Sequence, residues 1–314
     1  MAALSIVRFR HRGPAAACAI LAAFCAASVA EAVIVSGTGV TDNTSAPDPV
    51  WWNVGTRGDG SGTYLGNGWV LTANHIGGGA ITLNDGKTYQ MEPGSGRQLV
   101  NPGNQSPTDL YLFKVTTDPG LPWLNVATAT GTNDIVLMIG AGMTRGSEKY
   151  WSVDTNRLPW TWNEVVSGTY NAQGYTLLAQ RSMGWGVNVV TSKGPVTVGT
   201  TPVDAAFGTT FSTGLFSPPY DGYEGQASTG DSGGGVFRMN GSRWELAGIM
   251  VGVTPPFSGQ PASALFDYGH TYMADLPAYR DQIVAITAVP EPGALLLVAV
   301  GAGILGSRRF VRRR

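Results

Sequence analysis

The stretch Thr229-Gly230-Asp231-Ser232-Gly233-Gly234-Gly235 places one serine between an acid and a run of glycines. Glycine tolerates tight turns and close backbone approach, so the pattern indicates a sharp loop that presents the serine. The chain contains 44 glycines, and an ordinary turn is therefore the simplest interpretation of this stretch taken alone. Two segments that precede it in the chain change that interpretation.

These two segments carry an acid and a base. Trp69-Val70-Leu71-Thr72-Ala73-Asn74-His75 is an apolar strand pattern that ends in a histidine, and Thr108-Asp109-Leu110-Tyr111-Leu112 opens another strand with an aspartate. Histidine is the usual general base near neutral pH. Histidine, aspartate and serine in this order follow the chain order of one class of nucleophilic triad.

The three motifs resemble those of the trypsin-like serine proteases. Gly-Asp-Ser-Gly-Gly matches the nucleophile motif, Thr-Ala-Asn-His is similar to Thr-Ala-Ala-His, and Asp-Leu-x-Leu to Asp-Ile-Ala-Leu. The resemblance spans most of residues 34–286 and implies His75 as base, Asp109 as its orienting partner and Ser232 as nucleophile. It also implies an oxyanion hole formed by the backbone N–H groups of Gly230 and Ser232. Asn74 and Gly235 depart from the family pattern.

Two of these assignments have competitors in the sequence. His270 is the other histidine beyond the first 32 residues, but it lies in no family motif. Asp134 also precedes an apolar strand, although Ile135–Gly140 followed by Ala-Gly resembles a later family strand. We therefore favour His75 and Asp109.

Further roles follow from the resemblance alone. Asp231 corresponds to the acid that pairs with a new N-terminal amine after proteolytic activation, and Ile34 in Val-Ile-Val-Ser-Gly resembles the residue that supplies this amine. Gln226 falls at the floor of the primary substrate pocket, with Val251 and Val253 at its wall. A neutral floor argues against a preference for Lys or Arg. The altered pocket then either selects small or apolar side chains or forms an open groove.

The strand pattern predicts an all-β fold. Short β-branched and aromatic runs are separated by Gly, Pro, Asn, Asp and Ser clusters, as in antiparallel barrels. With the resemblance this implies two six-stranded antiparallel barrels, at about 33–145 and 146–275, with Gly140 to about Arg157 carrying the chain between them. A C-terminal helix at 277–286 is expected to be capped by Asp275.

Both ends of the chain are typical of processing signals. Residues 1–32 combine a basic start, an apolar run and the small-x-small site Ala30-Glu31-Ala32, which predicts a signal peptide removed by signal peptidase. Residues 289–314 combine Pro-Glu-Pro, an apolar segment and five arginines. This resembles the bacterial PEP-CTERM sorting signal, which implies transient membrane insertion and removal by an exosortase-type enzyme. A retained membrane anchor is the alternative at either end.

Composition limits the remaining possibilities. Between the two signals 12 basic and 19 acidic residues remain, a net charge of about −7, which disfavours nucleic-acid binding. Both cysteines, Cys18 and Cys25, fall in the signal, so we expect no disulfide, and we expect neither metal nor other cofactor. The sequence thus predicts a serine endopeptidase that acts on peptides or proteins in the periplasm, at the cell surface or outside the cell. An inactive protease-like binding module and an unrelated β-rich surface protein are the alternatives.

Overall fold

The computed structural model describes most of the region between the two expected signals. Its described residues are 32–37, 41, 50–166, 168–211, 222–254, 258–261, 264–266 and 269–287. The expected signal peptide up to residue 31 and the sorting segment 289–314 lie outside these residues. Among the described residues, no helix is long and apolar enough to cross a membrane.

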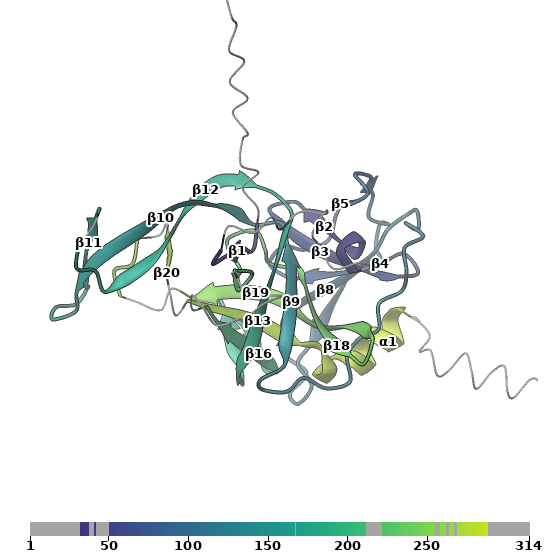
Figure 1. Cartoon of the computed structure of the whole chain (residues 1–314). Coiled ribbons are helices and arrows are strands. Elements are labelled where there is room, and N and C mark those ends of the chain that lie inside the picture. Colours follow the sequence, from purple (N-terminus) through teal and green to yellow (C-terminus); the bar gives the residue numbers. More distant parts are fainter. Residues whose placement is uncertain are drawn as a thin grey trace, which may run out of the picture.

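The first half of the molecule is a seven-stranded antiparallel sheet (Figure 1). Its strand order is β6-β5-β2-β3-β4-β8-β7, and the short 3-10 helix η1 (Val50–Asn53) leads into it. The strands are β2 (Val54–Arg57), β3 (Gly60–Gly66), β4 (Trp69–Ala73), β5 (Ile81–Leu83), β6 (Thr88–Tyr89), β7 (Arg97–Val100) and β8 (Pro107–Lys114). Asn67 and Gly68 both have positive φ, as a tight hairpin between β3 and β4 requires.

The second half is a closed barrel of six antiparallel strands. Its order is β13-β16-β21-β19-β18-β9, and β9 closes the barrel by pairing with both β13 and β18. The strands are β9 (Ile135–Gly140), β13 (Gly184–Lys193), β16 (Ala206–Thr210), β18 (Gly235–Asn240), β19 (Arg243–Thr254) and β21 (His270–Asp275). This barrel, the first sheet and a terminal helix confirm the expected all-β fold of two units.

The connection between the two halves differs from the sequence-based expectation. Because β9 belongs to the second barrel, the chain passes between the halves in the segment 115–134, before the boundary expected near residue 145. The segment expected to make this connection, which begins at Gly140, instead enters a long strand.

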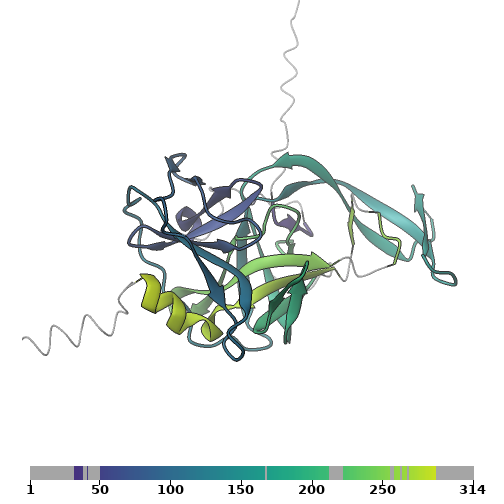
Figure 2. The ribbon, with the colours of Figure 1, turned by 180° about the vertical axis from the view of Figure 1, so that it is seen from behind.

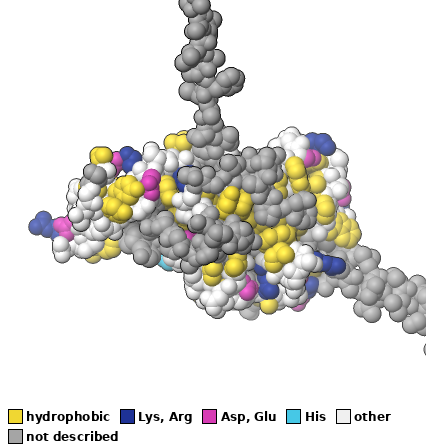
Figure 3. Space-filling model, viewed as in Figure 1, with side chains coloured by type: hydrophobic (Ala, Val, Ile, Leu, Met, Phe, Trp, Pro, Cys, Tyr) yellow, Lys and Arg dark blue, Asp and Glu magenta, His cyan; other side chains and the backbone are white. Residues whose placement is uncertain are grey.

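That strand belongs to a four-stranded antiparallel sheet, which we call the arm. Its order is β11-β10-β12-β20, with β10 (Met143–Asp154), β11 (Thr161–Val165), β12 (Ala172–Arg181) and β20 (Ala264–Phe266). Figures 1 and 2 show the arm projecting from the side of the molecule, and Figure 3 shows hydrophobic side chains on it. Trp151 is buried there and packs edge-on against Trp162, as expected of packing aromatics.

Two further two-stranded antiparallel sheets lie in the described part of the chain. β1 (Ile34–Val35) pairs with β17 (Gly225–Gln226), and β14 (Val196–Val198) pairs with β15 (Thr201–Val203). The first pairing joins the start of the described chain to the segment that leads into the glycine-rich loop.

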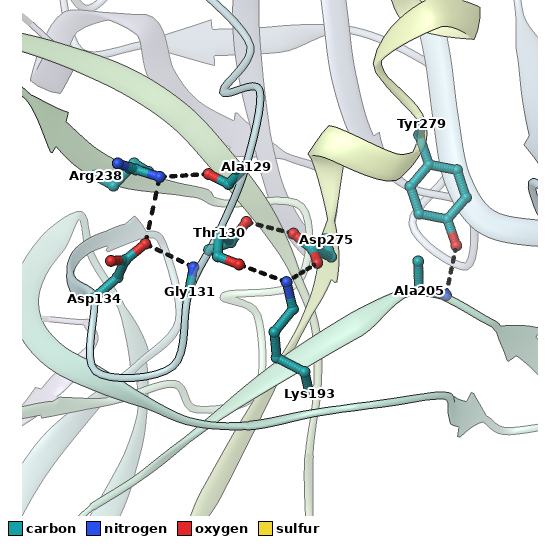
Figure 4. Close-up of polar contacts among 9 residues, drawn as sticks. All are labelled: Ala129, Thr130, Gly131, Asp134, Lys193, Ala205, Arg238, Asp275 and Tyr279. Carbon is teal, nitrogen blue, oxygen red and sulfur yellow. Dashed lines mark hydrogen bonds and ion pairs between the residues drawn. The ribbon is translucent and has the colours of Figure 1, made fainter.

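The C-terminal helix is present, but the prediction that Asp275 caps it is wrong. The 3-10 helix η2 (Leu276–Ala278) leads into α1 (Arg280–Thr287), and Asp275 makes no side-chain capping hydrogen bond. Its carboxylate instead accepts a hydrogen bond from Thr130 and pairs with Lys193 Nζ at 2.8 Å (Figure 4). Tertiary partners therefore outcompete the local cap.

The same C-terminal region fastens the two halves together. Gln282 donates to the carbonyl oxygen of Val100 at 2.8 Å and accepts from its N–H at 3.1 Å. Tyr279 is fully buried, and its hydroxyl contacts Asn101 of the first half and the N–H of Ala205 of the second (Figure 4).

Candidate active site

Neighbouring strands bring His75 and Asp109 together. Ala73 at the end of β4 lies opposite Leu110 in β8, so the residues just beyond this pair meet at one edge of the sheet. The N–H of His75 donates to Asp109 Oδ1 at 2.9 Å, and Nδ1 lies 2.7 Å from Oδ2. The histidine is thus held through both its backbone and its ring.

Burial of this pair is strongly asymmetric. The Asp109 side chain is 1% exposed, whereas that of His75 is 39% exposed. A carboxylate that accepts from Nδ1 selects the tautomer with its proton on that nitrogen, leaving Nε2 as the proton acceptor. The ring therefore presents a basic nitrogen on its more exposed side.

The two competing residues lie elsewhere. Asp134 precedes β9, where it accepts from the N–H of Gly131 at 2.8 Å and lies 3.4 Å from Arg238 Nη1 (Figure 4). His270 opens β21, and its Nδ1 lies 3.3 Å from the Thr210 hydroxyl.

The loop that carries Ser232 comes from the second barrel and packs against the first sheet. The carbonyl oxygen of Ser232 accepts from the N–H of Ser61 in β3 at 2.7 Å. A Cβ on Gly233 would overlap the carbonyl oxygen of Ser61 and the hydroxyl of Thr72, and Gly233 has φ +90°. Thr72 lies in β4, the strand that ends just before His75. Glycine at 233 thus lets the serine loop lie against the strand that leads to the histidine.

Ser232 itself is half-buried. Across the described residues, no hydrogen bond joins its hydroxyl to His75. Such contacts are often long in ligand-free enzymes and shorten when substrate binds.

The backbone of the same loop has N–H groups without protein acceptors. Gly234 N–H donates to Asp231 O at 2.8 Å, which closes a turn around Ser232. In the part of the chain that the structure describes, neither the N–H of Gly230 nor that of Ser232 donates to a protein acceptor. Gly230 has φ +100°, a conformation that favours glycine.

Asp231 lies fully buried beneath this loop. Its carboxylate accepts from the N–H of Gly142 at 2.8 Å and from the N–H and hydroxyl of Ser228 at 2.7 and 3.1 Å. A further hydrogen bond comes from the backbone of Val33. Burial nevertheless raises the pKa of Asp231 to about 6, because desolvation outweighs the hydrogen bonds that favour the charged form.

The segment 32–37 is therefore part of the site. Residues 32–35 are buried, Val33 rather than Ile34 contacts Asp231, and Ile34 pairs with Gln226 across β1 and β17. Val33 has φ +51°, which is unfavourable for a β-branched residue. The resemblance had assigned the contact with Asp231 to Ile34, the residue that follows Val33 in the chain.

The expected pocket residues have different environments. Gln226 is 2% exposed, and its Oε1 has no hydrogen-bond partner among the described residues. Val251 is buried in the core, whereas Val253 lines a cavity of about 370 Å³. The cavity is lined by Val196, Thr197, Val198, Gly199, Gly252, Val253 and Tyr272.

Sequence reasoning missed Arg181, whose guanidinium reaches the serine loop. It donates to the carbonyl oxygens of Ala141 at 2.8 Å and Gly230 at 3.4 Å. No motif surrounds this arginine, and only the pairing of β10 with β12 brings it to the loop.

Comparison with known proteins gives a similarity of overall arrangement. No protein-family model matches the chain, and no curated protein matches it. The solved structures that it resembles include the HtrA-type protease AlgW with a decapeptide, at 16% identity and a TM-score of 0.39, covering 74% of this chain and 52% of that one. A variant of the same protease with a decapeptide is 15% identical with a TM-score of 0.37, and the match covers 72% of this chain and 51% of that one. The chain thus spans about half the length of these proteases.

Proposed function

We propose that this chain is a serine endopeptidase in which His75, Asp109 and Ser232 form the catalytic triad. The observation that carries the proposal is the bidentate contact of His75 with the buried Asp109, at the end of the strand against which the Ser232 loop packs. The backbone of the serine loop, from the second half, contacts Ser61 and Thr72 of the first half, which supports a site formed between the two halves.

The proposed reaction is acyl transfer to the serine. His75 Nε2 removes the proton of the Ser232 hydroxyl as its oxygen attacks the substrate carbonyl, and Asp109 stabilises the imidazolium that results. The proton then passes to the leaving amine, and water repeats the sequence on the acyl-enzyme. The unpartnered N–H groups of Gly230 and Ser232 are the proposed oxyanion donors, and losing one such donor typically costs about 3 kcal/mol.

The pocket residues support a preference for uncharged side chains. Gln226 supplies a neutral amide rather than a carboxylate, so a buried Lys or Arg of the substrate lacks a counter-charge there. The cavity that Val253 lines has no charged residue on its wall, which is consistent with an uncharged side chain of the substrate.

We further propose that removal of the leader activates the enzyme. Cleavage after Ala32, as the small-x-small site predicts, makes Val33 the N-terminal residue and turns its buried N–H into an α-ammonium beside Asp231. An opposite charge there lowers the pKa of the carboxyl and favours its ionised form. Cleavage also removes the constraint on φ of Val33, because φ is defined by the carbonyl carbon of Ala32, which no longer precedes the Val33 nitrogen after the cut.

Export is part of the same proposal. The leader is proposed to be cut by signal peptidase, and the C-terminal segment to be recognised by an exosortase-type enzyme after transient membrane insertion. The mature protein would then act in the periplasm, at the cell surface or outside the cell, on peptides or proteins.

The test is labelling by a fluorophosphonate, which reacts with activated serines. The protein beginning at Val33 should be labelled and should cleave uncharged peptides faster than those with Lys or Arg at the cleavage site. Ser232→Ala and His75→Ala should each abolish labelling, whereas His270→Ala, the matched histidine control, should not. Equal labelling of Ser232→Ala would refute the assignment. A folded protein that is never labelled would favour a binding module.

A further inference from the structure

The base of the arm contacts two successive peptide groups of the serine loop. Met143 begins β10 and Arg181 ends β12, and the two residues pair directly across these strands. One contacts the peptide group before Gly230 and the other contacts the peptide group after it. The orientation of both groups therefore depends on the arm.

The first contact orients the N–H of Gly230. The N–H of Met143 donates to the carbonyl oxygen of Thr229 at 2.8 Å. In a planar trans peptide the C=O and N–H groups point in opposite directions. Holding the Thr229 carbonyl against Met143 therefore directs the Gly230 N–H away from the arm.

The second contact holds the carbonyl of Gly230. It accepts from the Ser61 hydroxyl at 2.9 Å and from Arg181 Nη2 at 3.4 Å. The guanidinium lies so close that a Cβ on Gly230 would overlap it. The N–H of the same peptide group, from Asp231, donates to Ser228 O at 3.1 Å.

Arg181 joins three separate parts of the molecule at this point. Besides Gly230, it donates to Ala141 O at 2.8 Å, Gly58 O at 3.1 Å and Gly60 O at 2.9 Å. Gly58 lies in the turn between β2 and β3, Gly60 begins β3, and Ala141 lies between β9 and β10. One side chain therefore connects the first sheet, the segment that leads into the arm and the serine loop. A planar guanidinium with five fixed donors suits this arrangement, which an ammonium cannot reproduce.

The arm also holds the segment beside Asp231. Arg145 in β10 donates to the carbonyl oxygens of Val35 and Gly37, and the hydroxyl of Tyr175 in β12 donates to Ser36 O at 2.6 Å. The same two strands therefore contact the loop from one side and the N-terminal segment from the other.

We propose that Arg181 is a positioning residue that, with the backbone of Met143, fixes the two peptide groups on either side of Gly230 and so holds the Gly230 N–H in the orientation that binds the oxyanion. The inference rests on the proposed function, because it assigns a role within the same site. Arg181 touches neither the reacting serine nor the histidine in the described contacts, and it acts through Gly230. The base of the arm thereby becomes part of the catalytic apparatus.

The test compares Arg181→Ala, Arg181→Lys and Arg238→Ala. Arg238 is a matched control, because its guanidinium also donates to a backbone carbonyl, that of Ala129 in the segment between the halves, and pairs with Asp134 rather than with the serine loop (Figure 4). For Arg181→Ala we expect kcat for a peptide substrate to fall by roughly tenfold to a hundredfold, with little change in KM. This decrease in kcat should not exceed the decrease caused by losing a whole oxyanion donor. Arg181→Lys should recover only part of the rate, and Arg238→Ala should leave it unchanged.

A second measurement is independent of activity. In ¹⁵N-labelled protein, the backbone amide resonance of Gly230 should shift in Arg181→Ala and stay in place in Arg238→Ala. An unmoved resonance, or an unchanged kcat in folded Arg181→Ala, would overturn the inference. If the unsubstituted protein is never labelled by the fluorophosphonate but the Gly230 resonance still moves, the proposed function fails while the positioning contact stands.

Discussion

Asp231 is a single residue that makes the stability of the fold depend on pH. With a peptide bond before Val33, its pKa is about 6 rather than the ordinary 3.8, because it is buried without an opposite charge. Its folded form therefore binds a proton more tightly than its unfolded form. The stabilisation is complete below about pH 3.8 and is lost as the pH rises through about 6, at roughly 1.4 kcal/mol per pKa unit or about 3 kcal/mol in all.

We therefore expect the two N-terminal forms to differ in this pH range. A chain that begins before Ala32 should lose about 2 kcal/mol of its free energy of unfolding between pH 4 and pH 6 relative to a chain that begins at Val33. Urea unfolding across this range measures the difference. Ser228→Ala removes one hydrogen bond to the carboxylate and should raise the pKa of Asp231 further in the longer chain. Parallel pH profiles for the two forms would contradict the pairing of Val33 with Asp231.

At this scale the sequence predicted the contact between His75 and Asp109, but not the residues that surround the candidate site. The motifs around His75 and Asp109 identified two residues that the structure brings into contact, since a motif records both the residue and its strand. Arg181 and the exact partner of Asp231 escaped prediction, because each depends on chain segments more than 30 residues away in the sequence. Val251 likewise looked like a pocket residue but packs into the core.

Among the elements, the arm is the part that the sequence failed to predict. Its first strand, β10, lies where the sequence predicted a connection between the barrels, because glycines and polar residues interrupt the apolar alternation there. Its outer part has its own small core around Trp151, which is separate from the barrel core. The strands β4, β8, β9 and β18 were recognised because buried strands carry continuous apolar runs.

The separate core of the outer arm leads to a prediction about its removal. Replacing residues 150–173 with Asn-Gly should leave the fold and the fluorophosphonate labelling rate within about twofold of the full chain, because the pairing of Met143 with Arg181 remains. Circular dichroism and labelling kinetics measure both. Adding Arg181→Ala to the shortened chain should slow labelling as in the full chain. Loss of labelling from the truncation alone would show that the outer arm also supports the site.

The whole molecule is organised around contacts between its halves. Ser61 of the first sheet binds both the Ser232 and Gly230 carbonyls of the serine loop, and Tyr279 and Gln282 connect the C-terminal helix to the first half. The two-unit architecture was predictable from strand patterning and resemblance. The position of the crossing between the halves was not, because β9 has the same apolar character as strands of either half.

Activation is a prediction at this largest scale, because it links the N-terminus to the loop through Asp231. The chain that begins at Val33 should be labelled by the fluorophosphonate at least about tenfold faster than one that begins before Ala32, the change that about 1.4 kcal/mol produces. Mass spectrometry of the exported protein should find Val33 at its N-terminus. A chain that begins at Ile34 is the matched control for length. If the longer chain is labelled as fast as the Val33 chain, the proposed activation is wrong.

The positive φ of Val33 has a consequence for when each molecule becomes active during export. If the cut that frees this residue also completes the site, then secretion and switching-on are one covalent event. Because hydrolysis of the peptide bond is not reversed, activation of each molecule is irreversible. A molecule still on the cytoplasmic side would carry its leader and stay harmless to its neighbours, and no second protease would be required to start its work.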